Sequence, residues 1–478
     1  MENESRRIGI LFSLAPVVFL VSTLFITIYY FKQDAHIPLL LSTAVASLIG
    51  VYFKYTWKEI REGMVKGILL AMPAILILFV IGTLVGTWFL SGIVPTMIYY
   101  GLKLLSPEIF LIASLLICSI ISLGTGSSWS TAATIGVALL AVGQSMGIPN
   151  YIIAGSIISG AYFGDKMSPL SDTTNLAPAV AGTDVFTHIR HMLYTTGPSY
   201  LITIILYYFI GTGYSSGTLN TENINSILNI LSSNFYISPI LLLAPAIVIA
   251  MVVFKIPPLP SLFAGTILGG IFAVIFQGST LSDVFLVAQS GFSITTGNAM
   301  VDELISGGGL LSMMKTVALI IFALSFGGIM EKAGMLNTIA TSLLKRVRRT
   351  GSLIAVTIFS SISMNIIASD QYMAIVVPGR MYKNAFDKAN LHPKNLSRCL
   401  EDSATLTSPL IPWNTCGAFM WATLGVNPLL YLPYAFLNLL NPIISIIYGY
   451  TGITIEKKDK SKKTDETEKK DETKKDLS

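Results

Sequence analysis

Charged side chains are scarce in this sequence: Asp, Glu, Lys and Arg make up 12% of its 478 residues, whereas soluble domains carry about 25%. Nine of the basic and eight of the acidic side chains lie in the last segment, Glu456 to Ser478, so the preceding 455 residues hold only 22 basic and 18 acidic ones. Hydrophobic residues make up 53% of the chain, and the mean hydropathy is +0.68. This composition excludes a soluble globular protein and indicates many membrane segments. The net charge of +5 therefore gives no reason to expect nucleic acid as a partner.

Cysteine is also rare, and the sequence lacks common metal-binding and nucleotide-binding motifs. The three cysteines, Cys118, Cys399 and Cys416, show no CxxC or Cys/His spacing, so we expect neither a disulfide nor a zinc site. No P-loop or HExxH pattern is present. A primary pump or a metal-dependent membrane hydrolase is thus unsupported, and we expect no enzymatic activity and no cofactor.

Long apolar runs account for most of the chain. A membrane-spanning helix needs about 20 apolar residues, and runs of that kind occupy 8–31, 37–53, 67–90, 192–212, 235–254, 259–277, 309–330 and 427–449. The first run follows Arg6 and Arg7 and exceeds the roughly 7–15-residue core of a signal peptide, so we interpret it as the first membrane helix. Basic clusters follow the second, seventh and last runs, which places these ends and both termini in the cytoplasm.

Four further segments are apolar at both ends but polar, or broken by Gly and Pro, in the middle: 107–145, 150–182, 351–385 and 395–425. Non-helical backbone at membrane depth persists only where protein or water satisfies its hydrogen bonds. We therefore interpret 107–145 and 351–385 as re-entrant hairpins. We interpret 150–182 and 395–425 as membrane helices that are interrupted near the bilayer centre.

A hairpin followed by a broken helix occurs twice, and the tripeptide Ser168-Pro169-Leu170 recurs 240 positions later as Ser408-Pro409-Leu410. The sequence thus predicts an all-α polytopic membrane protein of two inverted-topology repeats, with about ten spanning helices plus two hairpins. The predicted order is a cytoplasmic N-terminus (1–7), a first repeat (8–212), an extracellular loop (213–234), a second repeat (235–450) and a disordered charged cytoplasmic tail (451–478).

Charged residues inside the interrupted segments are candidates for function. A charge at the bilayer centre costs about 2.5–3.5 kcal/mol on insertion scales. Six charged residues fall in these segments near the breaks: Asp165, Lys166, Asp172, Asp370, Glu401 and Asp402. Because idle charges would only destabilise the membrane segments, we interpret these residues as parts of an ion path.

Asp165 is the first candidate for a carboxylate that exchanges ions, because it ends an apolar helix just before a Met-Ser-Pro break. Hard cations prefer oxygen ligands, and the residues that follow supply them: Ser168, Ser171, Asp172, Thr173, Thr174 and Asn175. Many neutral oxygens beside few charges suit Na⁺ better than a divalent ion, so we expect Na⁺ at Asp165 and Asp172. Two alternatives remain open: Asp165 pairs with Lys166 or caps a half-helix, and Asp172 caps the half-helix after the break.

Polar residues in the other interrupted segments predict a second ion or substrate site. The hairpin tips contribute Thr125, Ser127 and Ser128 in the first half and Asn365, Ser369 and Asp370 in the second. The second broken helix adds Glu401, Asp402, Thr405, Asn414 and Thr415. For the first tip, the alternative is close helix packing through small side chains.

Two stretches resemble the NhaC-type sodium/proton antiporter family: GTGSSWSTAATIGVALL (Gly124 to Leu140) and GAYFGDKMSPLSDTTNLAPAVAGTDVFTHIRHMLYTT (Gly160 to Thr196). The resemblance covers the membrane part and leaves out the tail. It implies a multi-pass protein of a bacterial plasma membrane, with paired hairpins and an elevator-like transport domain in contact with lipid. The family motif falls on Asp165, Lys166, Ser168, Ser171, Asp172, Thr173, Thr174 and Asn175. A homodimer would suit an elevator, which needs an anchored scaffold.

The intramembrane acids and the resemblance lead to one predicted function, given first, and one alternative, given second. The first is a secondary antiporter that exchanges Na⁺ for H⁺. The second is an exchanger of small carboxylates, such as malate and lactate, coupled to Na⁺ and H⁺. A carboxylate substrate would need half-helix N-termini and hydroxyl or amide donors, which the Ser, Thr and Asn of the tips could supply. A channel or a non-transporting sensor is disfavoured by the inverted repeat and the intramembrane acids.

Overall fold

The computed structural model describes residues 8–31, 33–104, 106–214, 221–254, 256–298, 301–302, 305–344 and 349–458. Within these ranges the protein is all-helical, with two isolated bridges, Phe292–Gly307 and Leu391–Lys457, and no β-strand. The helices of the first half are α1 Ile10–Phe25, α2 His36–Tyr52, α3 Trp57–Leu90, α4 Ile93–Leu104, α5 Pro107–Thr125, α6 Ser128–Thr131, α7 Val137–Ser145, α8 Asn150–Met167, α9 Asp172–Ala181, α10 Val185–Thr212 and α11 Thr221–Asn234. Those of the second half are α12 Leu243–Val253, α13 Pro258–Gln277, α14 Leu281–Ser290, α16 Met314–Lys332, α17 Met335–Leu344, α18 Thr350–Ile367, α19 Gln371–Lys388, α20 Pro393–Leu400, α21 Thr415–Leu424, α22 Pro428–Tyr431 and α23 Phe436–Thr451.

Six stretches of the described chain are long and apolar enough to cross a membrane: Ala71–Leu90, Pro107–Thr125, Val185–Thr212, Leu259–Gln277, Leu310–Lys332 and Thr350–Ile367. Two bent helix pairs, 226–251 and 428–451, raise the number to eight if each pair is one span. This number is lower than the ten spans expected. Helices such as α1 and α2, which coincide with predicted runs, have only 16 and 17 residues in regular α-helix.

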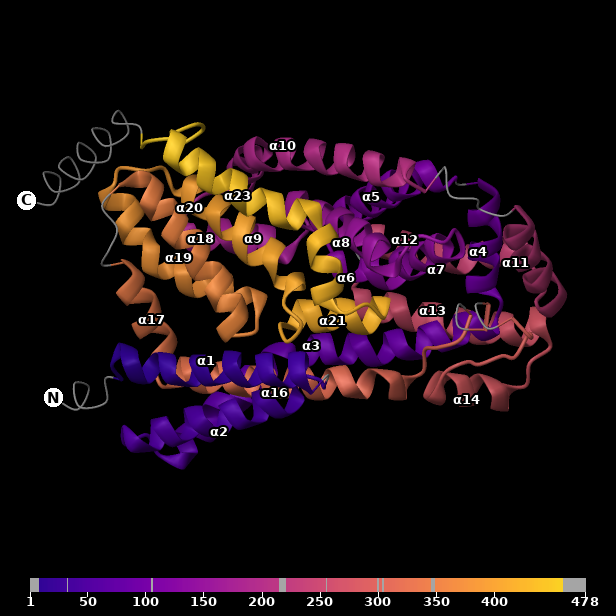
Figure 1. The fold of residues 1–478 in the computed structure, drawn as a ribbon, viewed down its shortest axis with the longest axis horizontal. Coiled ribbons are helices and arrows are strands. Elements are labelled where there is room, and N and C mark those ends of the chain that lie inside the picture. The colour runs from indigo at the N-terminus through magenta and orange to yellow at the C-terminus, as the bar shows by residue number, and fades with distance from the viewer. Residues whose placement is uncertain are drawn as a thin grey trace, which may run out of the picture.

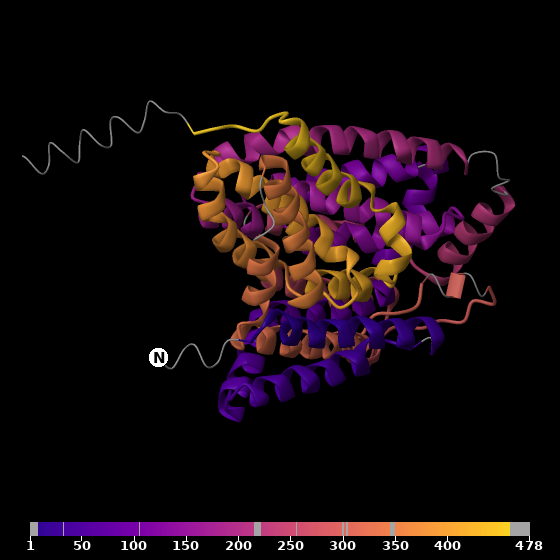
Figure 2. The same cartoon turned by 60° about the vertical axis from the view of Figure 1, so that its left-hand side comes forward.

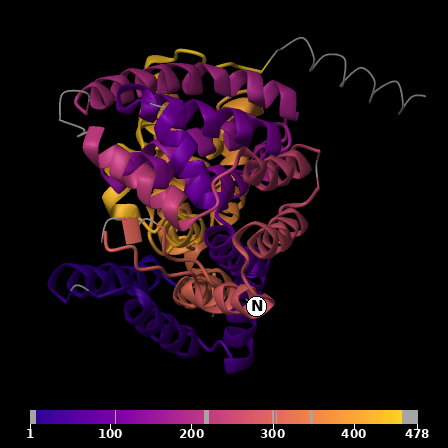
Figure 3. The same cartoon turned by 90° about the vertical axis from the view of Figure 1, so that its right-hand side faces the viewer.

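The helices form two layers (Figure 1). Helices α1, α2, α3 and α16 lie along the lower side of this view, and α5 to α10 and α18 to α23 lie above them. The same division is visible after rotation, with α1 and α2 beneath the main body (Figure 2) and α10 on the far side from α16 (Figure 3). The 34-residue α3 is the longest helix and begins with a capping box between Thr56 and Glu59.

All four segments that were predicted to be interrupted contain breaks. A tip at residues 126–127 joins α5 to α6, which continues through a π-helical turn, Ala132–Gly136, into α7. A tip at 368–370 joins α18 to α19. Helix α8 ends at Met167, and four residues, 168–171, separate it from α9. In the fourth segment, α20 continues through a π-helical turn, Glu401–Thr405, and the chain then loses regular α-helix until α21. Such π-helical turns occur frequently at functional sites.

Helices α5 and α8 pack closely through small residues. A Cβ atom added at Gly164 would lie 2.3 Å from the backbone nitrogen of Leu123, a distance that real Cβ atoms essentially never show. Glycine at this position therefore lets the end of α8 approach the end of α5. This contact sets the position of Asp165, the next residue along α8.

The structure differs from the sequence-based expectations at two connections. The range 213–234, expected as a loop, contains helix α11. Residues 452–458, which were expected to belong to a disordered tail, pack against the α19–α20 connection through backbone hydrogen bonds with Asn390 and His392 and through the side-chain amide of Asn395. The remainder of that range, 459–478, and the N-terminal residues 1–7 lie outside the described residues.

Candidate ion-binding site

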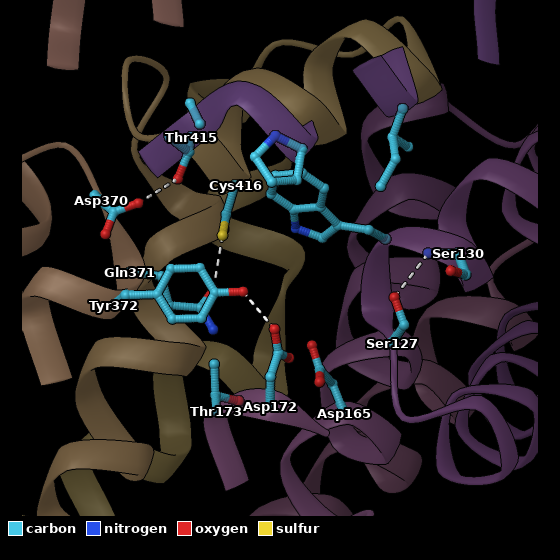
Figure 4. Close-up of a pocket in the computed structure, with 14 residues that line it drawn as sticks. Ser127, Ser130, Asp165, Asp172, Thr173, Asp370, Gln371, Tyr372, Thr415 and Cys416 are labelled. Atoms are coloured by element: carbon cyan, nitrogen blue, oxygen red, sulfur yellow. Dashed lines mark hydrogen bonds between the residues drawn. The ribbon is translucent and has the colours of Figure 1, made fainter. Parts of the chain in front are cut away.

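The two hairpin tips and the two helix breaks meet at one cavity of about 430 Å³ (Figure 4). Part of α3, with Ala71, Pro73 and Ile77, completes the wall. The interrupted segments contribute Ser127, Trp129 and Ser130 from the first tip, Asp165, Asp172 and Thr173 from the first break, Asp370, Gln371 and Tyr372 from the second tip, and Thr415 and Cys416 from the second break. Polar groups from four separate segments thus face the same space.

The first hairpin tip directs a helix N-terminus at Asp165. Gly126 has φ of +70°, a left-handed conformation that favours glycine. Ser127 then adopts extended backbone angles and its hydroxyl accepts a hydrogen bond from the N–H of Ser130 at 3.1 Å. The backbone N–H of the next residue, Ser128, donates to Asp165 Oδ2 at 3.3 Å. A helix N-terminus stabilises a nearby negative charge.

Asp165 is a buried carboxylate with both oxygens hydrogen-bonded. The hydroxyl of Ser128 donates to Oδ2 at 2.5 Å, and that of Ser171 donates to Oδ1 at 2.6 Å. The side chain is only 6% exposed, yet it lines the cavity. The predicted alternative of a pair with Lys166 is wrong, because Lys166 forms its ion pair with Asp402.

Three of the polar residues after Asp165 hold the break rather than line the cavity. The hydroxyl of Thr174 donates to the carbonyl oxygens of Asp165 at 3.0 Å and Lys166 at 2.9 Å. The amide of Asn175 donates to the carbonyl oxygens of Pro169 and Ser171. The hydroxyl of Ser168 accepts from the N–H of Leu170. These bonds satisfy the backbone that the break frees from the α-helical pattern.

Asp172 faces the cavity and contacts the second hairpin. Its Oδ2 accepts a hydrogen bond from the hydroxyl of Tyr372 at 2.5 Å, and the two side chains point toward one another in Figure 4. Ser171, not Asp172, occupies the N-cap position of α9. Thr173 is buried and its hydroxyl lies 3.1 Å from that of Ser171.

The second hairpin tip repeats the backbone geometry of the first. Ser369 has φ of +58°, and Asp370 is the N-cap of α19, accepting from the N–H of Met373 at 2.9 Å. Thr415 bridges this tip to the second break: its N–H donates to the carbonyl oxygen of Ser369 at 2.9 Å, and its hydroxyl lies 3.5 Å from Asp370 Oδ2. Gly126 and Ser369 therefore occupy matching positions.

Asn365 and Asn414 are buried behind the second tip. The side-chain amide of Asn365 donates to the carbonyl oxygen of Ala404 at 2.7 Å and to Thr407 Oγ1 at 3.0 Å. The amide of Asn414 donates in turn to Asn365 Oδ1 at 3.2 Å, and Asn414 caps α21. Their hydrogen bonds connect α18 to the second break.

Glu401 and Asp402 also lie outside the cavity wall, fully buried. Glu401 Oε2 accepts from the hydroxyl of Thr405 at 2.8 Å. Asp402 Oδ1 pairs with the ammonium group of Lys166 and accepts from the hydroxyl of Thr195 at 3.1 Å. Lys166 and Asp402 come from the two halves of the chain, so their ion pair ties the first break to the second.

Sequence reasoning missed several lining residues, chiefly Trp129, Gln371, Tyr372 and Cys416. Trp129 stacks on Phe419 with ring centroids 4.1 Å apart, and Gln371 Oε1 accepts from the hydroxyl of Ser408 at 2.9 Å. These four residues each lie within two positions of a predicted residue, whereas Ala71, Pro73 and Ile77 of α3 lie in an uninterrupted apolar run that gave no signal. Thr125, which was predicted, lies outside the wall, and its hydroxyl accepts from the N–H of Ser127.

Comparison with known proteins identifies the family. Residues 160–453 match the model of the Na⁺/H⁺ antiporter family. The chain belongs to this family. This antiporter is 41% identical over 448 residues to the Na⁺/H⁺ antiporter NhaC of Alkalihalophilus pseudofirmus, covering 94% of this chain and 96% of that protein. It is 40% identical to NhaC of Bacillus subtilis, with 94% and 99% covered, and 38% identical to the malate-2H⁺/Na⁺-lactate antiporter of Bacillus subtilis, with 93% and 96% covered.

The matched range contains both helix breaks and the second hairpin, so three of the four segments around the cavity lie within it. The relatives also set the remaining question, because they differ in the molecules that their names say they exchange.

Proposed function

We propose that this chain is a secondary antiporter that exchanges Na⁺ for H⁺ across the bacterial plasma membrane, with Asp165 as the carboxylate that binds either ion. The observation that carries this proposal is the charge of the cavity wall. Three carboxylates, Asp165, Asp172 and Asp370, line it, and none of the described lining residues is Lys, Arg or His. The nearest cation in sequence, Lys166, is turned away to Asp402. Such a wall attracts a cation.

Competition at Asp165 would couple the two fluxes. A carboxylate that holds a proton has lost the charge that binds Na⁺, and a carboxylate that holds Na⁺ resists protonation. The hydroxyl groups of Ser128 and Ser171 donate to this carboxylate and retain lone pairs that can face a hard cation. Alternating exposure of the cavity to the two sides would then exchange one ion for the other. Na⁺ and H⁺ are cargo in this scheme, and no cofactor takes part.

The inverted-repeat architecture belongs to the same proposal. The body of the first hairpin, α5 and α7, lies toward the right of Figure 1, and that of the second, α18 and α19, lies toward the left. Both tips nevertheless line one cavity, and each combines a positive φ with an extended N-cap residue. This opposed approach supports two inverted repeats with the site between them. Both termini would be cytoplasmic, as the basic clusters indicate.

The rival function is carboxylate exchange, which the malate–lactate relative brings into consideration. A dianion in this cavity would face three acids without a basic lining residue, so it would need bound cations to balance its charge. The cavity volume of about 430 Å³ is large enough for a small carboxylate, so volume does not exclude it. Electrostatics therefore favours the cation exchanger.

A transport assay with purified protein in sealed liposomes separates these functions. An internal pH dye reports proton flux under an imposed pH gradient, first with Na⁺ alone and then with Na⁺ plus malate or lactate. We expect Na⁺ alone to collapse the gradient. A proton flux that requires malate or lactate would overturn the proposal in favour of the carboxylate exchanger, and empty liposomes give the leak rate.

Ser128→Ala is expected to raise the KM for Na⁺ with a smaller change in maximal rate. A hydrogen bond to a charged group contributes about 1.5–3 kcal/mol, which corresponds to roughly 10–100-fold in affinity. The hydroxyl of Ser128 stabilises the ionised form of Asp165, which is the form that binds Na⁺. The KM is measured from proton flux at increasing Na⁺. Ser145→Ala, which removes a hydroxyl bonded within α7, is the matched control. An unchanged KM in Ser128→Ala would show that the hydroxyl of Ser128 does not contribute to Na⁺ binding.

A further inference from the structure

The segment after α23 returns to the body of the protein. Residues 452–458, here called the C-terminal strap, run beside the α19–α20 connection. The N–H of His392 and the side-chain amide of Asn395 both donate to the carbonyl oxygen of Glu456, at 2.9 and 2.7 Å. The N–H of Lys458 donates to the carbonyl oxygen of Asn390 at 3.0 Å. Backbone hydrogen bonds thus fix the course of the strap.

Two ion pairs flank these bonds, Lys394 with Glu456, and Lys458 with Asp387 at 2.9 Å. The carboxylates of both pairs are substantially exposed, and exposed ion pairs contribute roughly 0–1 kcal/mol. The two ion pairs therefore contribute little to the free energy of folding, and they do not explain why the strap is held by so many hydrogen bonds.

Thr454 of the strap contacts a buried side chain. Thr454 has φ of +60°, which is a strained conformation for a β-branched residue. In this conformation its hydroxyl oxygen accepts a hydrogen bond from Arg398 Nη1 at 2.8 Å. Arg398 is 0% exposed, and its Nε and Nη2 atoms have no hydrogen-bond partner in the described structure. The strap thus supplies the hydrogen bond that holds a buried guanidinium group.

Arg398 lies between the strap and the residues next to the candidate ion-binding site. Its Nε lies 3.9 Å from Asp402 Oδ2, and the other oxygen of Asp402 is paired with Lys166. Lys166 directly follows Asp165 in α8. A continuous line of polar contacts therefore joins the strap to the helix end that carries the exchanging carboxylate.

We propose that the C-terminal strap is a positioning element of the exchange machinery, in which Thr454 holds Arg398 against Asp402 and so fixes Lys166 and the end of α8. This proposal rests on the proposed function of Asp165. Two buried cations, Lys166 and Arg398, share the carboxylate of Asp402. The position of Arg398 therefore affects the orientation of this carboxylate and its ion pair with Lys166. Without its bond to Thr454, Arg398 moves relative to Asp402, Lys166 loses its fixed partner, and Asp165 shifts against Ser128 and Ser171. A contiguous network of this kind can carry coupling between distant sites.

The test compares two substitutions. Thr454→Val keeps the shape of the side chain and removes the hydroxyl, whereas Thr454→Ser keeps the hydroxyl and removes the methyl group. In liposomes we expect Thr454→Val to raise the KM for Na⁺ by roughly 2–30-fold, and Thr454→Ser to behave as the unaltered protein. A chain ending at Lys458 is expected to match the full chain, whereas one ending at Thr451 should reproduce the defect. Equal KM values in Thr454→Val and the unaltered protein would overturn the proposal, as would a normal KM in the chain ending at Thr451.

A thermal unfolding cycle tests the strap independently of transport. Apparent melting temperatures in detergent are compared for the unaltered protein, Thr454→Val, Asp402→Asn and the double variant. If Thr454 acts through Arg398 on Asp402, the effects of the two substitutions should not add. Additive effects would contradict the proposed network. Absence of Na⁺-driven proton flux in the unaltered chain would instead refute the proposed function, while the melting cycle would still decide whether Thr454 and Asp402 are coupled.

Discussion

Replacing Asp165 by Asn is expected to abolish Na⁺-driven proton exchange while the protein still inserts and folds. The amide has the shape of the carboxylate but neither binds a proton near neutral pH nor neutralises a cation. The fold should tolerate the change, because the hydroxyl groups of Ser128 and Ser171 can accept as well as donate hydrogen bonds and so can adapt to an amide. The predicted loss is therefore one of function, not of stability.

Proton flux in liposomes, together with the melting temperature in detergent, checks this expectation. Asp283→Asn is the matched control, since the Asp283 carboxylate accepts from the N–H and hydroxyl of Thr280 in the capping box of α14 and does not line the cavity. Asp172→Asn should retain partial exchange, because Asp172 is open to the cavity and bonded to Tyr372, whereas Asp165 is buried beneath two serines. Full exchange in Asp165→Asn would transfer the ion-binding role to Asp172 or Asp370, which share the cavity.

The interrupted segments could be predicted because their signals are local. The first interrupted segment was expected at 107–145, and in the structure α5 begins at Pro107 and α7 ends at Ser145. That this segment is re-entrant stays a prediction, because α5 alone is long and apolar enough to cross a membrane. Glycine, serine and proline interrupt otherwise apolar runs, and an interruption at membrane depth requires buried partners for the freed backbone. The same reasoning gave six residues of the cavity wall: Ser127, Asp165, Asp172, Thr173, Asp370 and Thr415.

The partners of these residues could not be predicted, because they depend on how distant segments pack. Lys166 and Asp402 are 236 positions apart, and nothing local in either sequence distinguishes their pairing from a pair between the neighbours Asp165 and Lys166. Similarly, Thr174 and Asn175 carry the oxygen atoms that favour a cation, yet their amide and hydroxyl groups are used by the broken backbone. Composition shows that polar groups are present, and only the packing shows which of them face the cavity.

The ion pair between Lys166 and Asp402 leads to the second large expected effect. Lys166→Met should lower the stability of the protein and eliminate exchange. Both side chains are fully buried, so removal of the cation leaves Asp402 with only Arg398 at 3.9 Å and the hydroxyl of Thr195 as partners. Breaking a buried pair in this way costs about 3–5 kcal/mol. The effect should appear as a lower melting temperature and as loss of proton flux.

A second substitution distinguishes the loss of a charge partner from the loss of a side chain. In Lys166→Met/Asp402→Asn both members of the pair are neutral, so the stranded charge of the single variant is removed. We expect the double variant to regain part of the lost stability, and only part, because Arg398 then lacks its carboxylate. Exchange should stay low even so, since the end of α8 is no longer tied to the second break. A single variant that melts like the unaltered protein would show that this pair does not hold the two halves together. Recovered transport in the double variant would show that the two halves hold Asp165 in place without the pair.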